Sequence, residues 1–89
     1  MSYRLLLHKS VTKFLKKCPA KQKQTLKEKL EQLKQNPLNE TLDIKSLQGY
    51  ENLYRLRVGQ VRLIYQIEND ELIIFIIKAG SRGDIYKEL

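Results

Sequence analysis

Residues 48–66, QGYENLYRLRVGQVRLIYQ, carry the clearest structural pattern in this chain of 89 residues. Two runs of alternating apolar and polar side chains meet at Gly59-Gln60. A two-residue connection with glycine first is typical of a type II′ turn, so the stretch predicts a β-hairpin. In the register that this turn sets, the predicted cross-strand pairs are Val58–Val61, Arg57–Arg62, Leu56–Leu63 and Arg55–Ile64.

The two faces of this hairpin differ in character, because side chains alternate between the faces of a strand. The face suited to a core consists of Tyr54, Leu56, Val58, Val61, Leu63 and Tyr65. The other face carries the arginine cluster, Arg55, Arg57 and Arg62, and the hairpin interior offers it no acidic partner. Like charges directly across an antiparallel pair normally destabilise a sheet. We therefore favour an anion-binding role for the cluster over a solvated face whose arginine stems only cover apolar surface.

Two amphipathic helices are predicted before the hairpin, after a short first strand at residues 3–8. Ser10 is a good N-cap for the first helix, which ends before Pro19. Pro19 also suits the start of the second helix, which extends to about Asn36. The apolar stripe of the second helix consists of Leu26, Leu30 and Leu33. We expect this stripe to cover the sheet rather than to form an interface.

The remaining segments complete one domain over residues 1–89. Residues 39–49 read as a polar linker, and residues 71–78 read as an aliphatic strand. The predicted order is β-α-α-β-β-β, which indicates an α+β fold. We expect a mostly antiparallel sheet with an N-terminal helical hairpin packed on one face, and the arginine cluster on the exposed face.

The charge of the chain favours a polyanionic partner. Seventeen Lys and Arg residues against ten Asp and Glu give a net charge of +7, and residues 1–37 alone hold ten basic and two acidic residues. The longest apolar run, residues 72–77, is too short to span a membrane, and no signal peptide is evident. With a single cysteine, the sequence indicates a cytoplasmic protein without membrane association.

The usual catalytic constellations are missing from the sequence. With one histidine and one cysteine, we expect no metal site and no cofactor. We expect His8 to be structural or solvent-exposed rather than catalytic, and Cys18 to be a small apolar packing residue. Arginine binds phosphate bidentately and keeps its charge. It therefore suits a ribonuclease that positions RNA for attack by its own 2′-hydroxyl, although a pKa above about 12 makes it a poor general base.

The segment LDIKSLQGYENLYRLRVGQVRLIYQI, followed by IIFIIKAGSRGDIY, resembles the RelE/ParE superfamily of toxin–antitoxin toxins, and its RelE branch in particular. The most specific parts are the pattern YRLRVGxxRLIYxI and the closing R…IY. The resemblance implies a RelE-like fold and a ribosome-dependent endoribonuclease that cuts mRNA in the ribosomal A site. It also implies a cognate RelB-like antitoxin, through which alone the toxin would bind operator DNA.

The same resemblance implies roles for individual residues. Arg57 stands where the family often has a lysine proposed as general base, and Arg62 matches the arginine that stabilises the scissile phosphate. Arg82 matches the residue proposed to protonate the leaving 5′-oxygen, and Tyr86 matches the tyrosine that stacks on the mRNA. The expected RNA-binding residues are Arg55 and Lys78.

Two alternatives stay open at this point. One is a ParE-like toxin that blocks DNA gyrase without cutting RNA. The other is a non-catalytic module, derived from a toxin, that binds antitoxin and operator. Because the acid–base groups are weak, the nuclease interpretation predicts poor cleavage of free RNA, with positioning supplied by the ribosome.

Overall fold

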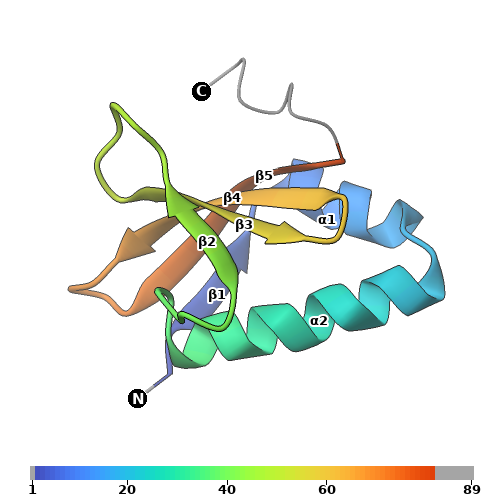
Figure 1. The fold of residues 1–89 in the computed structure, drawn as a ribbon, viewed down its shortest axis with the longest axis horizontal. Helices are drawn as coiled ribbons and strands as arrows, with labels where there is room; N and C mark the ends of the chain where they lie inside the picture. The colour runs from blue at the N-terminus through green and yellow to red at the C-terminus, as the bar shows by residue number, and fades with distance from the viewer. Residues whose placement is uncertain (1, 82–89) are drawn as a thin grey trace.

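The computed structural model describes residues 2–81, which form a five-stranded sheet with two helices on one face (Figure 1). The elements are β1 (Arg4–Leu7), α1 (Lys9–Lys17), α2 (Ala20–Gln35), β2 (Asp43–Ser46), β3 (Leu53–Val58), β4 (Val61–Glu68) and β5 (Ile73–Gly80). The spatial order is β1-β5-β4-β3-β2, and every neighbouring pair is antiparallel except β1 with β5. The predicted α+β architecture is confirmed, with one strand more than expected.

The additional strand lies in the segment that we expected to be a linker. Asp43–Ser46 form β2, which pairs antiparallel with β3 at the edge of the sheet. Its sequence, DIKS, has little intrinsic preference for a strand. The unpaired backbone groups of β3 supply the hydrogen bonds that hold it extended. The prediction of a polar linker was therefore wrong for these four residues.

The hairpin itself has the predicted register. Every pair expected from the turn is present between β3 and β4. Gly59 has a φ of +61°, which the first central position of a type II′ turn requires and which residues with a Cβ adopt only with strain. A Cβ added at this glycine would meet nothing within 4 Å, so the requirement for glycine is conformational rather than spatial.

The start of α1 differs from the prediction by two residues. His8, and not Ser10, is the N-cap, and its Nδ1 accepts a hydrogen bond from the backbone N–H of Ser10 at 3.1 Å. The Ser10 hydroxyl also lies 2.9 Å from this nitrogen. His8 thus has the structural role assigned to it. The second helix ends at Gln35, one residue before the predicted end.

The core lies between the helices and the inner face of the sheet. Leu26, Leu30 and Leu33 are buried there, which confirms the predicted packing of α2. The buried partners from α1 and the sheet include Val11, Leu56, Val61, Leu63, Tyr65, Ile67, Ile74 and Ile76. The buried Tyr65 donates its hydroxyl hydrogen to the carbonyl oxygen of Pro37 at 2.7 Å. Burial, and secondarily the neighbouring Tyr54, raise the pKa of Tyr65 above its ordinary value.

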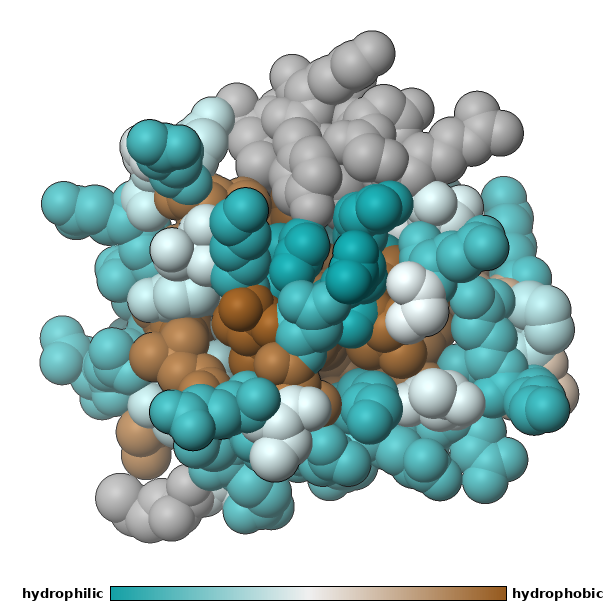
Figure 2. Space-filling view, in the orientation of Figure 1, coloured by the Kyte–Doolittle hydropathy of each residue, from teal (hydrophilic) through white to brown (hydrophobic). Residues whose placement is uncertain are grey.

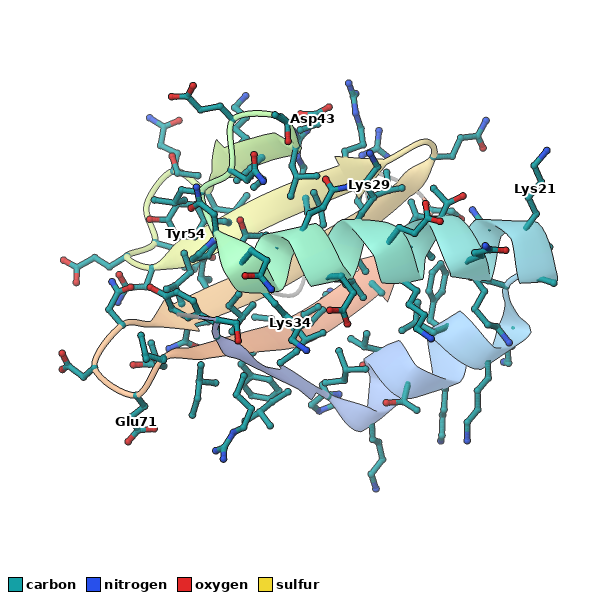
Figure 3. The ribbon with its side chains drawn as sticks, turned by 90° about the horizontal axis from the view of Figure 1, so that it is seen from below. Lys21, Lys29, Lys34, Asp43, Tyr54 and Glu71 are labelled. Atoms are coloured by element: carbon teal, nitrogen blue, oxygen red, sulfur yellow. The ribbon has the colours of Figure 1, made fainter. Side chains whose placement is uncertain are left out.

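Both helices lie on this inner side, so the opposite face of the sheet carries no described helix (Figures 1 and 3). Seen with β2 in front, the surface is mainly hydrophilic, with apolar areas exposed between the polar side chains (Figure 2). Among residues 2–81, no helix is long and apolar enough to cross a membrane. Exposure varies across this outer face: Ile64, opposite Arg55, is fully buried, whereas about half of the Arg57 side chain is exposed.

Candidate functional site

Two rows of side chains cross the outer face of the sheet from β2 to β5. The first row consists of Asp43, Arg57, Arg62 and Gly80, which lie opposite one another on successive strands. The second row consists of Lys45, Arg55, Ile64 and Lys78. The arginine cluster therefore lies together on the face of the sheet opposite the helices, as predicted. Gly80 adds no side chain at the end of the first row beside Arg62, and it is partly buried.

A carboxylate from β2 joins the cluster. Arg55 donates from Nη2 to Oδ1 of Asp43 at 2.7 Å, and Arg57 donates from Nε to Oδ2 of Asp43 at 2.8 Å. Sequence reasoning missed this residue because it searched for an acidic partner inside the hairpin. The available signal was the alternation of Leu42 and Ile44 with Asp43 and Lys45, which is the pattern of a short strand.

The three arginines differ in the exposed fraction of the side chain and in the ion pairs that they make. The side chain of Arg57 is 49% exposed, whereas that of Arg55 is 15% exposed and its Nε is buried without a hydrogen-bond partner among residues 2–81. Arg62 is partly buried, and we observe no ion pair from its side chain to the described residues. Unengaged N–H donors thus remain on this face, in the fork geometry that suits phosphate.

A β-bulge brings Lys78 to the same face. Tyr65 pairs with Ile76, but the next pair along the ladder is Ile64 with Lys78, so β5 holds one extra residue at Ile77. A regular ladder would place Ile77 opposite Ile64 and turn Lys78 toward the core. The bulge reverses this alternation and places the lysine in the second row, two strands from Arg55.

The remaining predicted residues, Arg82 and Tyr86, lie outside the described residues. The structure thus brings together Arg55, Arg57, Arg62 and Lys78, and leaves the tail positions as predictions. Among residues 2–81, no group of three or more His, Cys, Asp or Glu side chains is arranged to hold a metal ion.

Charged groups elsewhere among residues 2–81 lie away from the arginine cluster. Glu68 and Arg4 share the outer face but lie in the row through Ile73, toward the other end of β4. Glu71 lies at the tip of the β4–β5 turn, well away from Asp43 on β2 (Figure 3). The labelled lysines of α2, including Lys21 and Lys29, belong to the helical side of the molecule (Figure 3). Most lysines of the two helices are exposed, so they form a second basic surface. Among residues 2–81, the carboxylate that we observe bound to the arginine cluster is Asp43, through Arg55 and Arg57.

Known proteins are similar to this chain in sequence and in fold. A family model described as the ParE toxin of the type II toxin-antitoxin system parDE matches residues 5–86. A Methanocaldococcus jannaschii protein is 40% identical to this chain over 88 residues, with 98% of both chains covered. It is named as the toxin RelE1, and that name states no activity. The mRNA interferase toxin RelE of Escherichia coli is 27% identical over 92 residues, with 99% of this chain and 94% of the relative covered.

A solved structure has a similar fold. The archaeal RelE-RelB complex from Pyrococcus horikoshii OT3 has a TM-score of 0.82 with this chain at 34% sequence identity, and the alignment covers 93% of this chain and 98% of that one. The match extends over the helices and the sheet, including the strands that carry the arginine cluster. The chain therefore belongs to the RelE/ParE superfamily of type II toxins.

Proposed function

We propose that this protein is the toxin of a type II toxin–antitoxin pair, and that it is a ribosome-dependent endoribonuclease that cuts mRNA in the ribosomal A site. The observation that carries the proposal is the arginine cluster, fixed in cross-strand register on the sheet face opposite the helices. Guanidinium groups held in this way bind phosphate and stabilise charge that develops on it. The relatives named RelE, among them the E. coli mRNA interferase, support the same activity.

The roles of the residues follow from their places on this face. Arg62, opposite Arg57 at the end of the hairpin, stabilises the scissile phosphate while the substrate's own 2′-hydroxyl attacks it. Arg55 and Lys78 bind the flanking backbone from the second row. By resemblance to the family, Arg57 stands at the position of the general base, but as a permanently charged guanidinium it binds phosphate there rather than removing a proton. By the same resemblance, Arg82 protonates the leaving oxygen and Tyr86 stacks on the mRNA.

A cytoplasmic location for this protein and a RelB-like antitoxin partner complete the proposal. The Pyrococcus relative was solved as a RelE-RelB complex. The exposed lysines of the two helices and the net charge of +7 suit an acidic segment of such a partner. Operator DNA would then be bound through the complex rather than by the toxin alone.

A second candidate function is inhibition of DNA gyrase, because the matching family model is described as the ParE toxin. That activity would not need an arginine cluster arranged for a scissile phosphate. A supercoiling assay with gyrase separates the two: the nuclease proposal expects no inhibition at toxin concentrations that cut mRNA on ribosomes.

The test of the nuclease proposal is a reconstituted translation reaction programmed with a defined mRNA, in which primer extension maps the breaks. We expect wild type to make codon-positioned breaks with ribosomes present and almost none in free RNA. Arg62→Ala should cut about 10²–10³-fold more slowly, because it removes one charge-stabilising group.

Arg4→Ala is the matched control, since it removes the same side chain from β1, at the far edge of the sheet. We expect Arg4→Ala to cut at close to the wild-type rate. Intact mRNA in the presence of active ribosomes and folded wild-type toxin would reject the nuclease function. Rapid cutting of naked RNA would reject the dependence on ribosomes.

A further inference from the structure

Asp43 contacts two arginines of the proposed RNA-binding face at once. Each of its carboxylate oxygens accepts one hydrogen bond, from Arg55 Nη2 at 2.7 Å and from Arg57 Nε at 2.8 Å. The carboxylate is itself 44% exposed, so it lies at the surface of the site and not beneath it. Its position is set by the β2–β3 ladder, in which Asp43 is directly opposite Arg57.

The geometry leaves the phosphate-binding end of Arg57 available. A guanidinium carries five N–H donors, and Asp43 uses the Nε–H of Arg57, which leaves both terminal nitrogens unused by this contact. Fixing Nε sets the plane of the guanidinium and therefore the direction of its terminal fork. Arg57 remains 49% exposed while it is paired, so the fork can still meet a ligand.

Arg55 is held more deeply. Only 15% of its side chain is exposed, and its single recorded side-chain partner among residues 2–81 is Asp43. One carboxylate therefore orients a deep and a shallow guanidinium together. Arginine side chains carry substantial rotamer freedom, so prior orientation lowers the entropy that RNA binding must remove.

We propose that Asp43 is a positioning residue for RNA cleavage, which holds Arg55 and Arg57 in the orientation that receives the mRNA phosphates. This inference rests on the proposed nuclease function. Asp43 does not touch the substrate in this scheme; it acts through the two arginines. The competing reading is that Asp43 is an anion in the place of a phosphate, which the substrate must displace.

The two readings predict opposite results for the removal of Asp43. A positioning residue raises the rate of the chemical step, so Asp43→Ala lowers that rate even though the site gains positive charge. A competing anion lowers both affinity and rate, so Asp43→Ala raises them. The added positive charge alone strengthens RNA binding, so the rate at saturating toxin is the deciding quantity.

The experiment is single-turnover cleavage of mRNA on programmed ribosomes, at toxin concentrations that separate apparent affinity from the maximal rate. Asp43→Ala should lose about 10–100-fold in maximal rate with affinity equal to or tighter than wild type. Asp43→Glu, which keeps the carboxylate, should recover part of this loss. Asp70→Ala is the matched control, because it makes the same change of aspartate to alanine in the β4–β5 turn. This variant should cleave like wild type.

An activity-independent measurement reads the contact itself. In ¹⁵N NMR spectra of free toxin, the Nε–H of Arg57 should be protected from solvent exchange in wild type and in Asp70→Ala, and unprotected in Asp43→Ala. A wild-type or faster maximal rate in Asp43→Ala would overturn the positioning role while leaving the nuclease function intact. Failure of wild type to cut on ribosomes would reject the nuclease function, and the proposed role of Asp43 with it.

Discussion

Alternating residues of the same two strands form the two faces of the β3–β4 hairpin, yet the inner face is apolar and the outer face carries arginines. On the inner face Leu56 and Leu63 are 0% exposed, whereas on the outer face the side chain of Arg57 is 49% exposed. Leu63 directly follows Arg62 in the chain. Adjacent positions therefore differ in role: the inner leucines are buried in the core, whereas the neighbouring arginines present charge on the outer face, which is the face proposed to bind RNA.

The forces on the two faces also differ in kind. Burial of apolar surface is non-directional and depends on area and packing. The arginine cluster depends on direction, because a guanidinium binds only where its N–H groups point. A change on one face should consequently alter stability with little change in chemistry, and a change on the other should do the reverse.

The largest expected effect comes from Leu63→Ala. The truncation leaves a cavity in the packed core, so we expect the free energy of unfolding to fall by about 2–5 kcal/mol, which urea denaturation measures. Arg62→Ala is the neighbouring control and should change stability by less than about 0.5 kcal/mol. Equal destabilisation by the two variants would contradict the separation of the faces.

Tyr65→Phe is expected to have an intermediate effect on stability. It sharpens the comparison of the two faces because it removes a buried hydroxyl from the inner face. The variant leaves the carbonyl of the buried Pro37 without the 2.7 Å hydrogen bond, and should lower the free energy of unfolding by about 1.5 kcal/mol at neutral pH.

The pH dependence of this variant has a definite sign. Because burial raises the pKa of Tyr65 in the folded state, the folded protein favours the neutral phenol. That contribution is complete below the unfolded pKa of about 10 and is lost as the pH rises above it. The stability difference between wild type and Tyr65→Phe should therefore shrink above about pH 10, as urea denaturation at pH 7 to 11 would measure. A constant difference would contradict this.

The smallest expected effect is that of Gly59→Ala, at the turn that sets which residues occupy each face. The φ of +61° costs a residue with a Cβ about 1 kcal/mol, so thermal unfolding should occur at a slightly lower temperature. Cross-strand NOEs should still show Arg57 opposite Arg62. Gln60→Ala, at the next position of the turn, should leave the unfolding temperature unchanged.

Several features of the protein follow from local sequence alone. The alternation on either side of Gly59 is a period-2 pattern, which specifies both the register of the hairpin and the face of each arginine. The leucine stripe of α2 is a helical pattern, and it predicted the core contacts correctly. These patterns are reliable because each depends on residues within one or two elements.

Other features depend on contacts between distant segments. Asp43–Ser46 become a strand only because β3 offers an edge to pair with, and Lys78 reaches the arginine face only because a bulge at Ile77 shifts the register of β5. The alternation of Leu42 and Ile44 with Asp43 and Lys45 indicates a short strand but not its partner, and the bulge leaves no distinct local signal. Both the pairing and the bulge are decided by hydrogen bonding to another strand. The sequence by itself thus determined where the arginines lie. Only the tertiary structure decided that Asp43 of β2 binds two of these arginines. Asp43 lies 12 and 14 positions from Arg55 and Arg57 in the chain, and the strand pairing that joins them is not encoded by short-range propensity.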